Sequence, residues 1–127
     1  MPIALKRVYD PVSKDDGMRI LVDRLWPRGL SKERAKIDQW LRDVAPSDAL
    51  RKWFNHEPEK WARFKRRYFE ELRGHDGIIQ EIRQLASRET VTLVFAAKEK
   101  RMNNAVAFKE YVLRSRKGVR SKRTKLE

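Results

Sequence analysis

VTLVFA, residues 91–96, is a short and nearly unbroken apolar run, and MRILVD, residues 18–23, has the continuous apolar centre Ile20-Leu21-Val22. Runs of this kind are typical of strands that are covered on both faces, as in the parallel sheets of α/β proteins. A β-permissive stretch at residues 3–8 adds a further strand at the start of the chain. We therefore expect a small α/β domain with a short, mostly parallel sheet.

A long helical insertion is expected between the second and third predicted strands. Ser47 fits the N-cap of a helix, and Pro58 fits the first turn of the following one, where its missing N–H costs nothing. Gly74 would end that helix and Asp76 would cap the next. The apolar side chains recur at helical spacing in four groups: Ile37, Trp40, Leu41 and Val44; Leu50, Trp53 and Phe54; Trp61, Phe64, Tyr68 and Leu72; and Ile78, Ile79, Ile82, Leu85 and Ala86.

Charge is the main feature of the composition. The chain of 127 residues has 31 Lys and Arg against 18 Asp and Glu, which gives a net charge of +13. Residues 114–127 hold seven basic residues and one acidic residue, and so contribute +6 of this total. We expect one α/β domain over residues 1–113 and a basic, disordered tail over residues 114–127. Such a charge favours nucleic acid or phosphorylated ligands as partners, although a charge run more often serves only solubility.

Several classes of protein and of site are excluded or disfavoured. There is no cysteine, so disulfides, thiolate metal sites and cysteine nucleophiles are excluded. Two histidines are too few for an all-histidine metal site, and we predict no metal site and identify no cofactor. No apolar run approaches the roughly 20 residues of a membrane span, so we expect a cytoplasmic protein with no membrane partner. Glycine-rich phosphate loops and the common hydrolase motifs are absent.

Polar clusters follow all three predicted strands. In open α/β sheets, ligands bind outside the carboxyl ends of the strands. If the three strands are parallel, their ends meet at one edge of the sheet and bring these clusters together. The residues that we expect to converge there are Asp10, Asp23, Arg24, Arg28 and Lys98.

The residue types in these clusters favour an anion site. Arg24 and Arg28 offer planar, bidentate donors that suit phosphate or carboxylate, and Lys98 adds a point charge. Either Asn103 or Asn104 can cap a last helix, whose N-terminus would add free N–H groups and the positive end of a dipole. A phosphorylated ligand is therefore expected at this edge.

Other interpretations of the same residues stay open. Asp10 and Asp23 can orient the arginines, act as acid or base, or hold a metal ion through bridging water. Asp23 and Arg24 can equally form a buried ion pair that only locks the loop. Trp26 can line a ligand site, but a tryptophan in so small a domain is more often part of the core. His56 has a side chain whose ordinary pKa suits proton transfer, although a lone histidine near a helix junction is more often structural.

Five blocks of the sequence are similar to one known family. They resemble the YeaO-like family, a branch of the group called domain of unknown function 488, and the similarity runs from about Lys6 to about Leu113. The blocks are RVYDP (residues 7–11), ILVDRLWPRGLSKE (20–33), IDQWLRDVAPS (37–47), LRKWFNHEPEKWARF (50–64) and VTLVFAAKEKRMNNA (91–105).

The resemblance implies a small Rossmann-like three-layer α/β domain with parallel strands, and it implies no assigned activity. In the wider group the second strand ends in an Asp-x-Arg-like signature, which Asp23-Arg24 matches loosely. There the last strand leads to a cluster containing cysteine and histidine. Here Ala96-Ala97-Lys98 and Asn103-Asn104 stand in its place, which argues against shared cysteine chemistry.

Three functions are compatible with these observations. The first is an enzyme or binding protein for a small phosphorylated, nucleotide-like ligand at the strand-end edge. The second is a nucleic-acid-binding module that uses the tail and basic helix faces such as Lys65-Arg66-Arg67. The third is a structural or interaction protein without a small ligand. Whether the protein is an enzyme, and its oligomeric state, stay open.

Overall fold

The computed structural model of the protein describes residues 3–114. Four strands and a set of short helices alternate along the chain, and a last helix covers residues 104–114. The elements in chain order are β1 (Ile3–Arg7), η1 (Lys14–Asp16), β2 (Met18–Leu21), α1 (Lys32–Ala35), β3 (Gln39–Trp40), η2 (Arg42–Val44), α2 (Asp48–Phe54), η3 (Pro58–Lys60), α3 (Trp61–Leu72), η4 (Arg73–His75), α4 (Asp76–Arg88) and β4 (Val91–Phe95).

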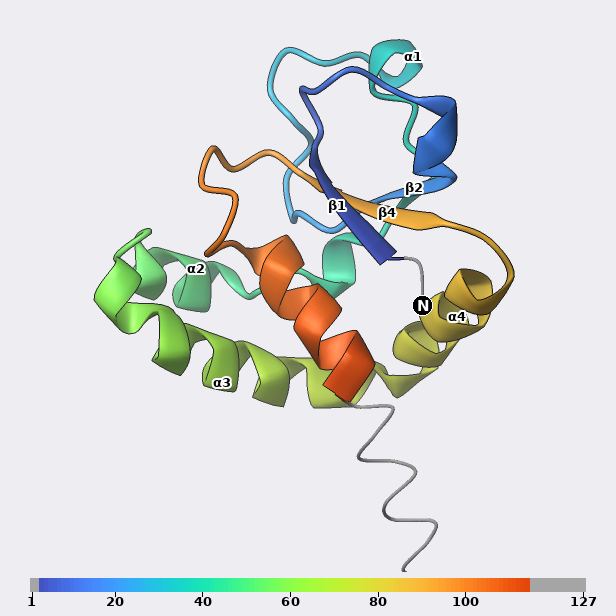
Figure 1. The fold of residues 1–127 in the computed structure, drawn as a ribbon. Coiled ribbons are helices and arrows are strands. Elements are labelled where there is room, and N and C mark those ends of the chain that lie inside the picture. Colours follow the sequence, from blue (N-terminus) through green and yellow to red (C-terminus); the bar gives the residue numbers. More distant parts are fainter. Residues whose placement is uncertain (1–2, 115–127) are drawn as a thin grey trace, which may run out of the picture.

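The strands form one parallel sheet in the order β1-β4-β2-β3 (Figure 1). The most apolar strand, β4, lies between β1 and β2, with Leu93 paired to Leu5 on one side and to Ile20 on the other. All five residues of β4 are buried. The prediction of a small α/β fold with parallel strands is confirmed.

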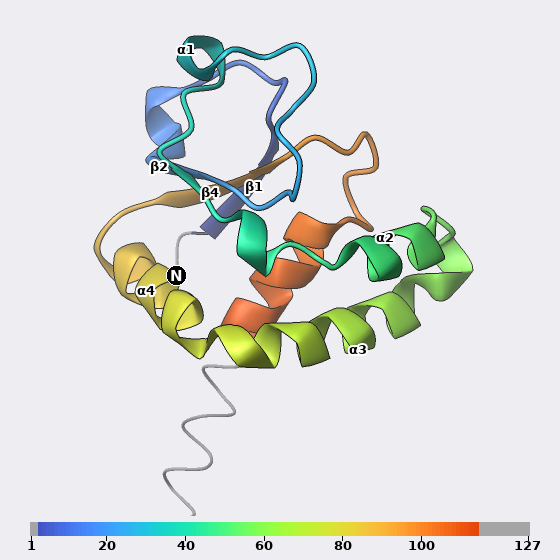
Figure 2. The same cartoon turned by 180° about the vertical axis from the view of Figure 1, so that it is seen from behind.

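Both faces of the sheet are covered, but by different kinds of structure. Figures 1 and 2 show α2, α3, α4 and the last helix together on one face, where they enclose the larger core. On the other face, α1 and the loops around it enclose a smaller cluster. That second cluster consists of Val8, Leu21, Ala35 and Val94, with Trp26, Leu30, Ile37, Trp40 and Ala96 packed against it. The outer layer on this side is therefore made mostly of loops.

The helix predicted around residues 37–44 is wrong. Gln39–Trp40 form the edge strand β3, because Asp38 N–H donates to Arg19 and Leu41 N–H donates to Leu21 on the neighbouring strand. The apolar spacing that suggests a helix has another origin. The side chains of residues 37 and 40 pack in the smaller cluster, whereas those of residues 41 and 44 pack in the larger one. The spacing thus reflects two cores on opposite faces of the sheet.

The helical insertion otherwise follows the predicted order. Ser47 caps α2, since its hydroxyl accepts the N–H of Leu50 at 3.2 Å. Pro58 starts the η3 turn that leads into α3, and the buried stripe of α3 is Phe64, Tyr68 and Leu72. The predicted C-terminal end of α3 is wrong in detail.

The chain passes from α3 to α4 without a break. The η4 turn at Arg73–His75 joins them, so Gly74 lies in a helical turn and does not terminate the helix. Asp76 is the first residue of α4 and not its cap, and no side chain caps this helix. Figures 1 and 2 show that the chain changes direction between α3 and α4, which this 3₁₀ turn connects.

A buried ionic cluster lies where β2 begins, at the opposite end of the strand from the polar loops. The Asp16 carboxylate accepts from Arg19 Nη1 at 2.7 Å and from Lys6 Nζ at 3.0 Å. The hydroxyl of Thr92 also donates to the Asp16 carbonyl. Gly17 follows with φ 62°, a left-handed conformation that favours glycine. This cluster fixes β1, β2 and β4 relative to one another.

Within residues 3–114, no helix is both long and apolar enough to cross a membrane. The predicted basic tail lies outside the described residues except for its first member, Arg114. The guanidinium of Arg114 lies over the ring of Phe69, 5.6 Å from its centroid.

Candidate functional site

A cavity of about 340 Å³ lies at the carboxyl ends of the strands, and we call it the rim cavity. Its walls come from the loop after β2, the loop after β4, and the start and end of α2. The lining residues are Tyr9, Asp23, Arg24, Leu25, Trp26, Pro27, Arg28, Ala45, Pro46, Arg51, Phe54, His56, Phe64, Ala96, Ala97, Asn103 and Asn104.

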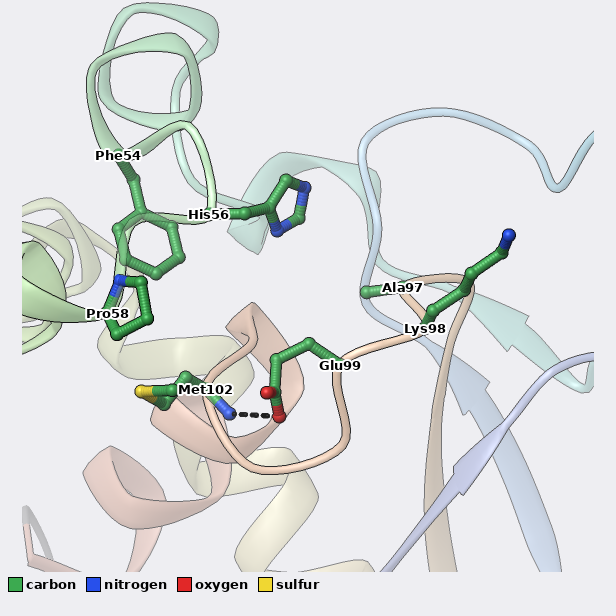
Figure 3. A pocket seen from close by; sticks show the side chains of 7 residues that line it. All are labelled: Phe54, His56, Pro58, Ala97, Lys98, Glu99 and Met102. Carbon is green, nitrogen blue, oxygen red and sulfur yellow. Dashed lines mark hydrogen bonds between the residues drawn. The ribbon is translucent and has the colours of Figure 1, made fainter.

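A second hollow of about 380 Å³ adjoins it, and we call it the side hollow (Figure 3). Phe54, His56 and Ala97 line both spaces. The predicted site residues divide between them: Asp23, Arg24, Trp26, Arg28, His56, Asn103 and Asn104 line the rim cavity, Lys98 lines the side hollow, and Asp10 lines neither.

The loop after β2 is held in place by side chains that bond to its backbone. Trp26 Nε1 donates to the carbonyl of Leu30 at 2.7 Å, and Trp40 Nε1 donates to that of Asp23 at 2.8 Å. The two indole rings meet edge to face, with centroids 5.4 Å apart. Trp26 therefore belongs to the smaller core and to the cavity wall, so both interpretations of it apply in part.

The carboxylate of Asp23 is the centre of a hydrogen-bond network in the cavity wall. One oxygen accepts the backbone N–H of Ala96 at 2.8 Å, and the other accepts from Asn104 Nδ2 at 2.9 Å. Burial raises the pKa of the Asp23 carboxyl above its ordinary value, and these two bonds offset part of that rise. Because donors already occupy both oxygens, Asp23 connects the loops that follow β2 and β4.

Arg24 is fixed by backbone oxygens. Its Nε donates to Pro46 and its Nη2 to Ala45, both at 3.2 Å. The two groups of the suggested ion pair thus have other partners, and no salt bridge joins Asp23 to Arg24 within residues 3–114. Arg24 holds the segment before α2 against the loop after β2, and its Nη1 has no protein acceptor in this part of the chain.

The other cations at the site are more exposed. Only the backbone of Arg28 is bonded among the interactions found in residues 3–114, since its carbonyl accepts the Tyr9 hydroxyl at 2.9 Å. Arg51, on α2, makes an exposed pair with Asp48 at 3.3 Å. Lys98 is exposed as well, and Figure 3 shows its side chain extending away from the floor of the side hollow. The guanidinium groups of residues 28 and 51 can therefore turn toward a ligand at little cost.

Asn103 and Asn104, which follow β4, form hydrogen bonds with different parts of the structure. Asn103 caps the last helix, because its Oδ1 accepts the N–H of Val106 at 3.0 Å and its Nδ2 donates to the Glu99 carbonyl. Asn104 instead donates to the carbonyl of Val22 at 3.0 Å and to the carboxylate described above. The helix start is thereby attached to the end of β2.

His56 lies on the ridge between the two spaces. It follows the C-cap of α2, and both Asn55 and His56 have left-handed backbone, with φ 46° and 55°. Its ring lies 6.1 Å from that of Phe54. Asp10, in contrast, is only half-buried and lines neither space, so the predicted convergence is incomplete.

Sequence reasoning missed several lining residues. The sequence places Phe54 only on a helix and gives no role to Arg51, yet both line the rim cavity from α2. Tyr9 also lines the rim cavity, although only its neighbour Asp10 is a predicted site residue. The aromatic side chains at positions 54 and 64 stack with centroids 4.5 Å apart. No local pattern in the sequence shows that these helices cross the carboxyl edge of the sheet.

Comparison with known proteins identifies the family. The family model described as "Inactive DUF488-N3 subclade" matches residues 2–125. The chain belongs to the DUF488-N3i family. The YeaO-like resemblance is thereby confirmed: this DUF488-N3i chain is 39% identical over 112 residues to the uncharacterised protein YeaO of Escherichia coli K12, covering 88% of this chain and 97% of YeaO.

Mycobacterial relatives match over a shorter stretch. The uncharacterised proteins Mb3100c of Mycobacterium bovis and Rv3073c of Mycobacterium tuberculosis H37Rv are each 44% identical over 97 residues, which is 76% of this chain and 80% of each relative. No solved structure matches the DUF488-N3i chain.

The two spaces are lined mainly by cations and by apolar and aromatic side chains. Among the described residues of this DUF488-N3i chain, the lining side chains include no serine, threonine or cysteine, and the Tyr9 hydroxyl already donates to Arg28. No group of three or more His, Cys, Asp or Glu in residues 3–114 is placed to hold a metal ion. What the site offers is guanidinium donors above apolar and aromatic walls.

Proposed function

We propose that this protein binds a small phosphorylated, nucleotide-like ligand in the rim cavity. The observation that carries the proposal is the gathering of three guanidinium groups, from Arg24, Arg28 and Arg51, around one largely apolar space. Guanidinium forks bind phosphate oxygens in bidentate fashion. A cavity of about 340 Å³ also lies within the size range of small-molecule sites.

The charge balance of the lining supports an anion over a cation. Asp23 is the one acidic residue among the described residues that line the rim cavity, and N–H donors engage both of its oxygens. A bound phosphate would therefore meet three cations and one shielded carboxylate.

Binding without processing is the form of the proposal that we favour. The lining offers no free hydroxyl or thiol nucleophile among residues 3–114, and the family description itself contains the word "inactive". Phosphorylated metabolites and nucleotides are intracellular compounds, so the proposal includes a cytoplasmic location.

The test is a thermal-shift and calorimetric screen of inorganic phosphate, ribose 5-phosphate and nucleoside monophosphates on the full chain. A ligand at 100 times its Kd should stabilise the fold by about 2.7 kcal/mol. Arg28→Ala should weaken binding about tenfold or more without changing the melting temperature, since a charge-assisted bond contributes about 1.5–3 kcal/mol. Arg66→Ala, an exposed arginine on α3 that does not line the cavity, is the matched control. The absence of any shift with every phosphorylated compound would reject the proposal.

Nucleic-acid binding is a second candidate, favoured by the outer face of α3. Arg63, Arg66 and Arg67 are exposed there, and Arg67 lies over the ring of Trp53, 4.3 Å from its centroid. Cations of this kind can contact backbone phosphates, and stacked arginine–aromatic pairs suit single strands.

Salt dependence separates the second candidate from the first. Oligonucleotide affinity should fall steeply with salt, with a slope of about −0.9 for each phosphate contact on duplex DNA. Changing residues 63, 66 and 67 to Ala should reduce that slope, whereas a chain ending at Arg114 measures the share of the tail. An empty result in both screens would favour a structural or interaction role instead.

A further inference from the structure

We propose that the side hollow is a nucleobase subsite, in which Glu99 selects bases that carry an amino group. This inference rests on the proposed function, because the phosphate of the same ligand would lie in the rim cavity. It goes beyond that function because it places the base in the side hollow and makes Glu99 the residue that determines which bases bind.

The two spaces are positioned for one ligand with two parts. Phe54, His56 and Ala97 form walls of both, so a molecule can pass from one into the other beside these residues. The arginines line only the rim cavity, whereas Pro58 and Met102 line only the side hollow. A nucleoside monophosphate has the same division, with an anionic end and an aromatic end joined by one ribose.

The walls of the side hollow suit a flat aromatic group. Figure 3 shows Phe54 and Pro58 on one side, Ala97 on the other, and Met102 with Glu99 at the base of the space. The Phe54 ring is held from behind, since it stacks on Phe64 with centroids 4.5 Å apart. Aromatic rings stack on nucleobases, and the polarizable thioether of methionine packs well against aromatic groups.

His56 closes the space from above in Figure 3. Its backbone is left-handed, which a non-glycine residue adopts at some energetic cost. His56 lines both spaces, at the place where the ribose of the ligand would pass. A polar ring at this boundary can donate to or accept from ribose hydroxyls.

Glu99 supplies a hydrogen-bond acceptor at the base of the hollow. Its Oε2 accepts the backbone N–H groups of Arg101 and Met102, and these two bonds hold the pKa of the Glu99 carboxyl below its ordinary value. The carboxylate is therefore ionised at neutral pH. No donor within residues 3–114 occupies its Oε1. An exocyclic amino group, as in adenine or cytosine, would bond to that oxygen.

Changing Glu99 to glutamine should change the preference among bases. In Glu99→Gln the amide oxygen can keep the two backbone N–H bonds, so the NH₂ group takes the place of Oε1. A donor then faces the base, which should favour the keto oxygen of uracil over an amino group. Because the two loop bonds are retained, Glu99→Gln should fold as the parent does, and its unfolding transition checks this directly.

The experiment compares inorganic phosphate, ribose 5-phosphate, AMP, CMP and UMP by calorimetry on the full chain. We expect AMP and CMP to bind about tenfold or more tightly than ribose 5-phosphate. UMP should bind more weakly than CMP, which has the same ring size. Glu99→Gln should reverse the order of CMP and UMP.

Met102→Ala should remove most of the advantage of AMP over ribose 5-phosphate, and Met102→Leu should retain it because the apolar contact stays. Neither change should alter phosphate binding. If ribose 5-phosphate and all nucleotides bind equally in every variant, the base subsite is wrong while the phosphate site stands. If none of the compounds binds, the proposed function is rejected, and this inference with it.

Discussion

The side-chain amide of Asn104 donates to the carboxylate of Asp23 at 2.9 Å, across 81 positions of sequence. The same nitrogen donates to the carbonyl of Val22 at 3.0 Å. One side chain at the start of the last helix thus binds both the carbonyl of the residue that follows β2 and the acid next to it. The wall of the rim cavity depends on this connection between distant segments.

Asn104→Ala should destabilise the fold by about 1–3 kcal/mol, because it leaves buried acceptors without a donor. The pKa of Asp23 should rise further, since a bond that lowers it is lost. Urea denaturation measures the first effect and NMR titration of the carboxyl the second. A double-mutant cycle with Asp23→Ala isolates the pair, and strictly additive losses would show that the bond contributes nothing.

The stability of the protein at acid pH should depend on Asp16. Burial alone would raise the pKa of this carboxyl, but the Ser13 N–H and the cations of Lys6 and Arg19 outweigh it, and the pKa is lowered from 3.8. The folded state therefore binds the proton less readily than the unfolded state. The resulting stability is present above about pH 4 and is lost as pH falls through the lower, folded value.

Asp16→Asn should abolish that part of the pH dependence and cost about 2–3 kcal/mol at neutral pH. Thermal unfolding between pH 2 and 7 is the measurement. The variant and the parent should converge in stability at the lowest pH. An undiminished acid slope in the variant would mean that other carboxyl groups cause it.

Gly17→Ala should be strongly destabilising. The residue has φ 62°, and an added Cβ would lie 2.2 Å from the carbonyl oxygen of Thr90, which accepts the N–H of Met18. We expect a loss of about 3 kcal/mol. Gly74→Ala is the matched control, because nothing lies within 4 Å of its Cβ position and its backbone is not left-handed. That change should be neutral or stabilise by about 0.5 kcal/mol. Equal effects at the two positions would contradict the assigned geometry.

The two arginines of the loop after β2 should behave differently when changed. Arg24→Ala removes bonds to the carbonyls of Ala45 and Pro46, so we expect a loss of about 1–2 kcal/mol of stability together with weaker phosphate binding. Arg28→Ala should weaken binding alone, since no bond of its guanidinium is found within residues 3–114. Chemical denaturation beside calorimetry distinguishes the two, and a stable Arg24→Ala protein with normal binding would refute the assignment.

Much of the fold follows from local pattern. The apolar runs at residues 18–23 and 91–96 are strands, and their lack of alternation is explained by cover on both faces. The strand at Gln39–Trp40 could not be predicted in this way. It consists of two residues, and its pairing with β2 is a long-range contact that leaves no periodic signal.

Most of the predicted site residues lie in or beside loops that follow a strand, and His56, which follows α2, is the exception. Residues 23, 24 and 28 were found because they follow β2 directly, whereas Arg51 and Phe54 depend on where a separate helix is placed. Asp10 failed to join the others although it also follows a strand. Asp10 lines neither space, whereas the neighbouring Tyr9 lines the rim cavity. Proximity to a strand end thus helps to predict which residues line the cavity, but the direction of each loop determines which side chain faces it.

The central place of β4 has a consequence for how the chain acquires its structure. Strands β1 and β2 are made first, yet they are not neighbours, and each pairs with β4, which follows some seventy residues after β2. Until Val91–Phe95 has emerged from the ribosome, the two early strands have unpaired backbone edges and exposed apolar side chains. The helices at residues 48–88 can form locally during that wait, but their apolar faces lack a sheet to cover. We therefore expect this protein to fold late and nearly all at once, and to need protection from aggregation while it is synthesised.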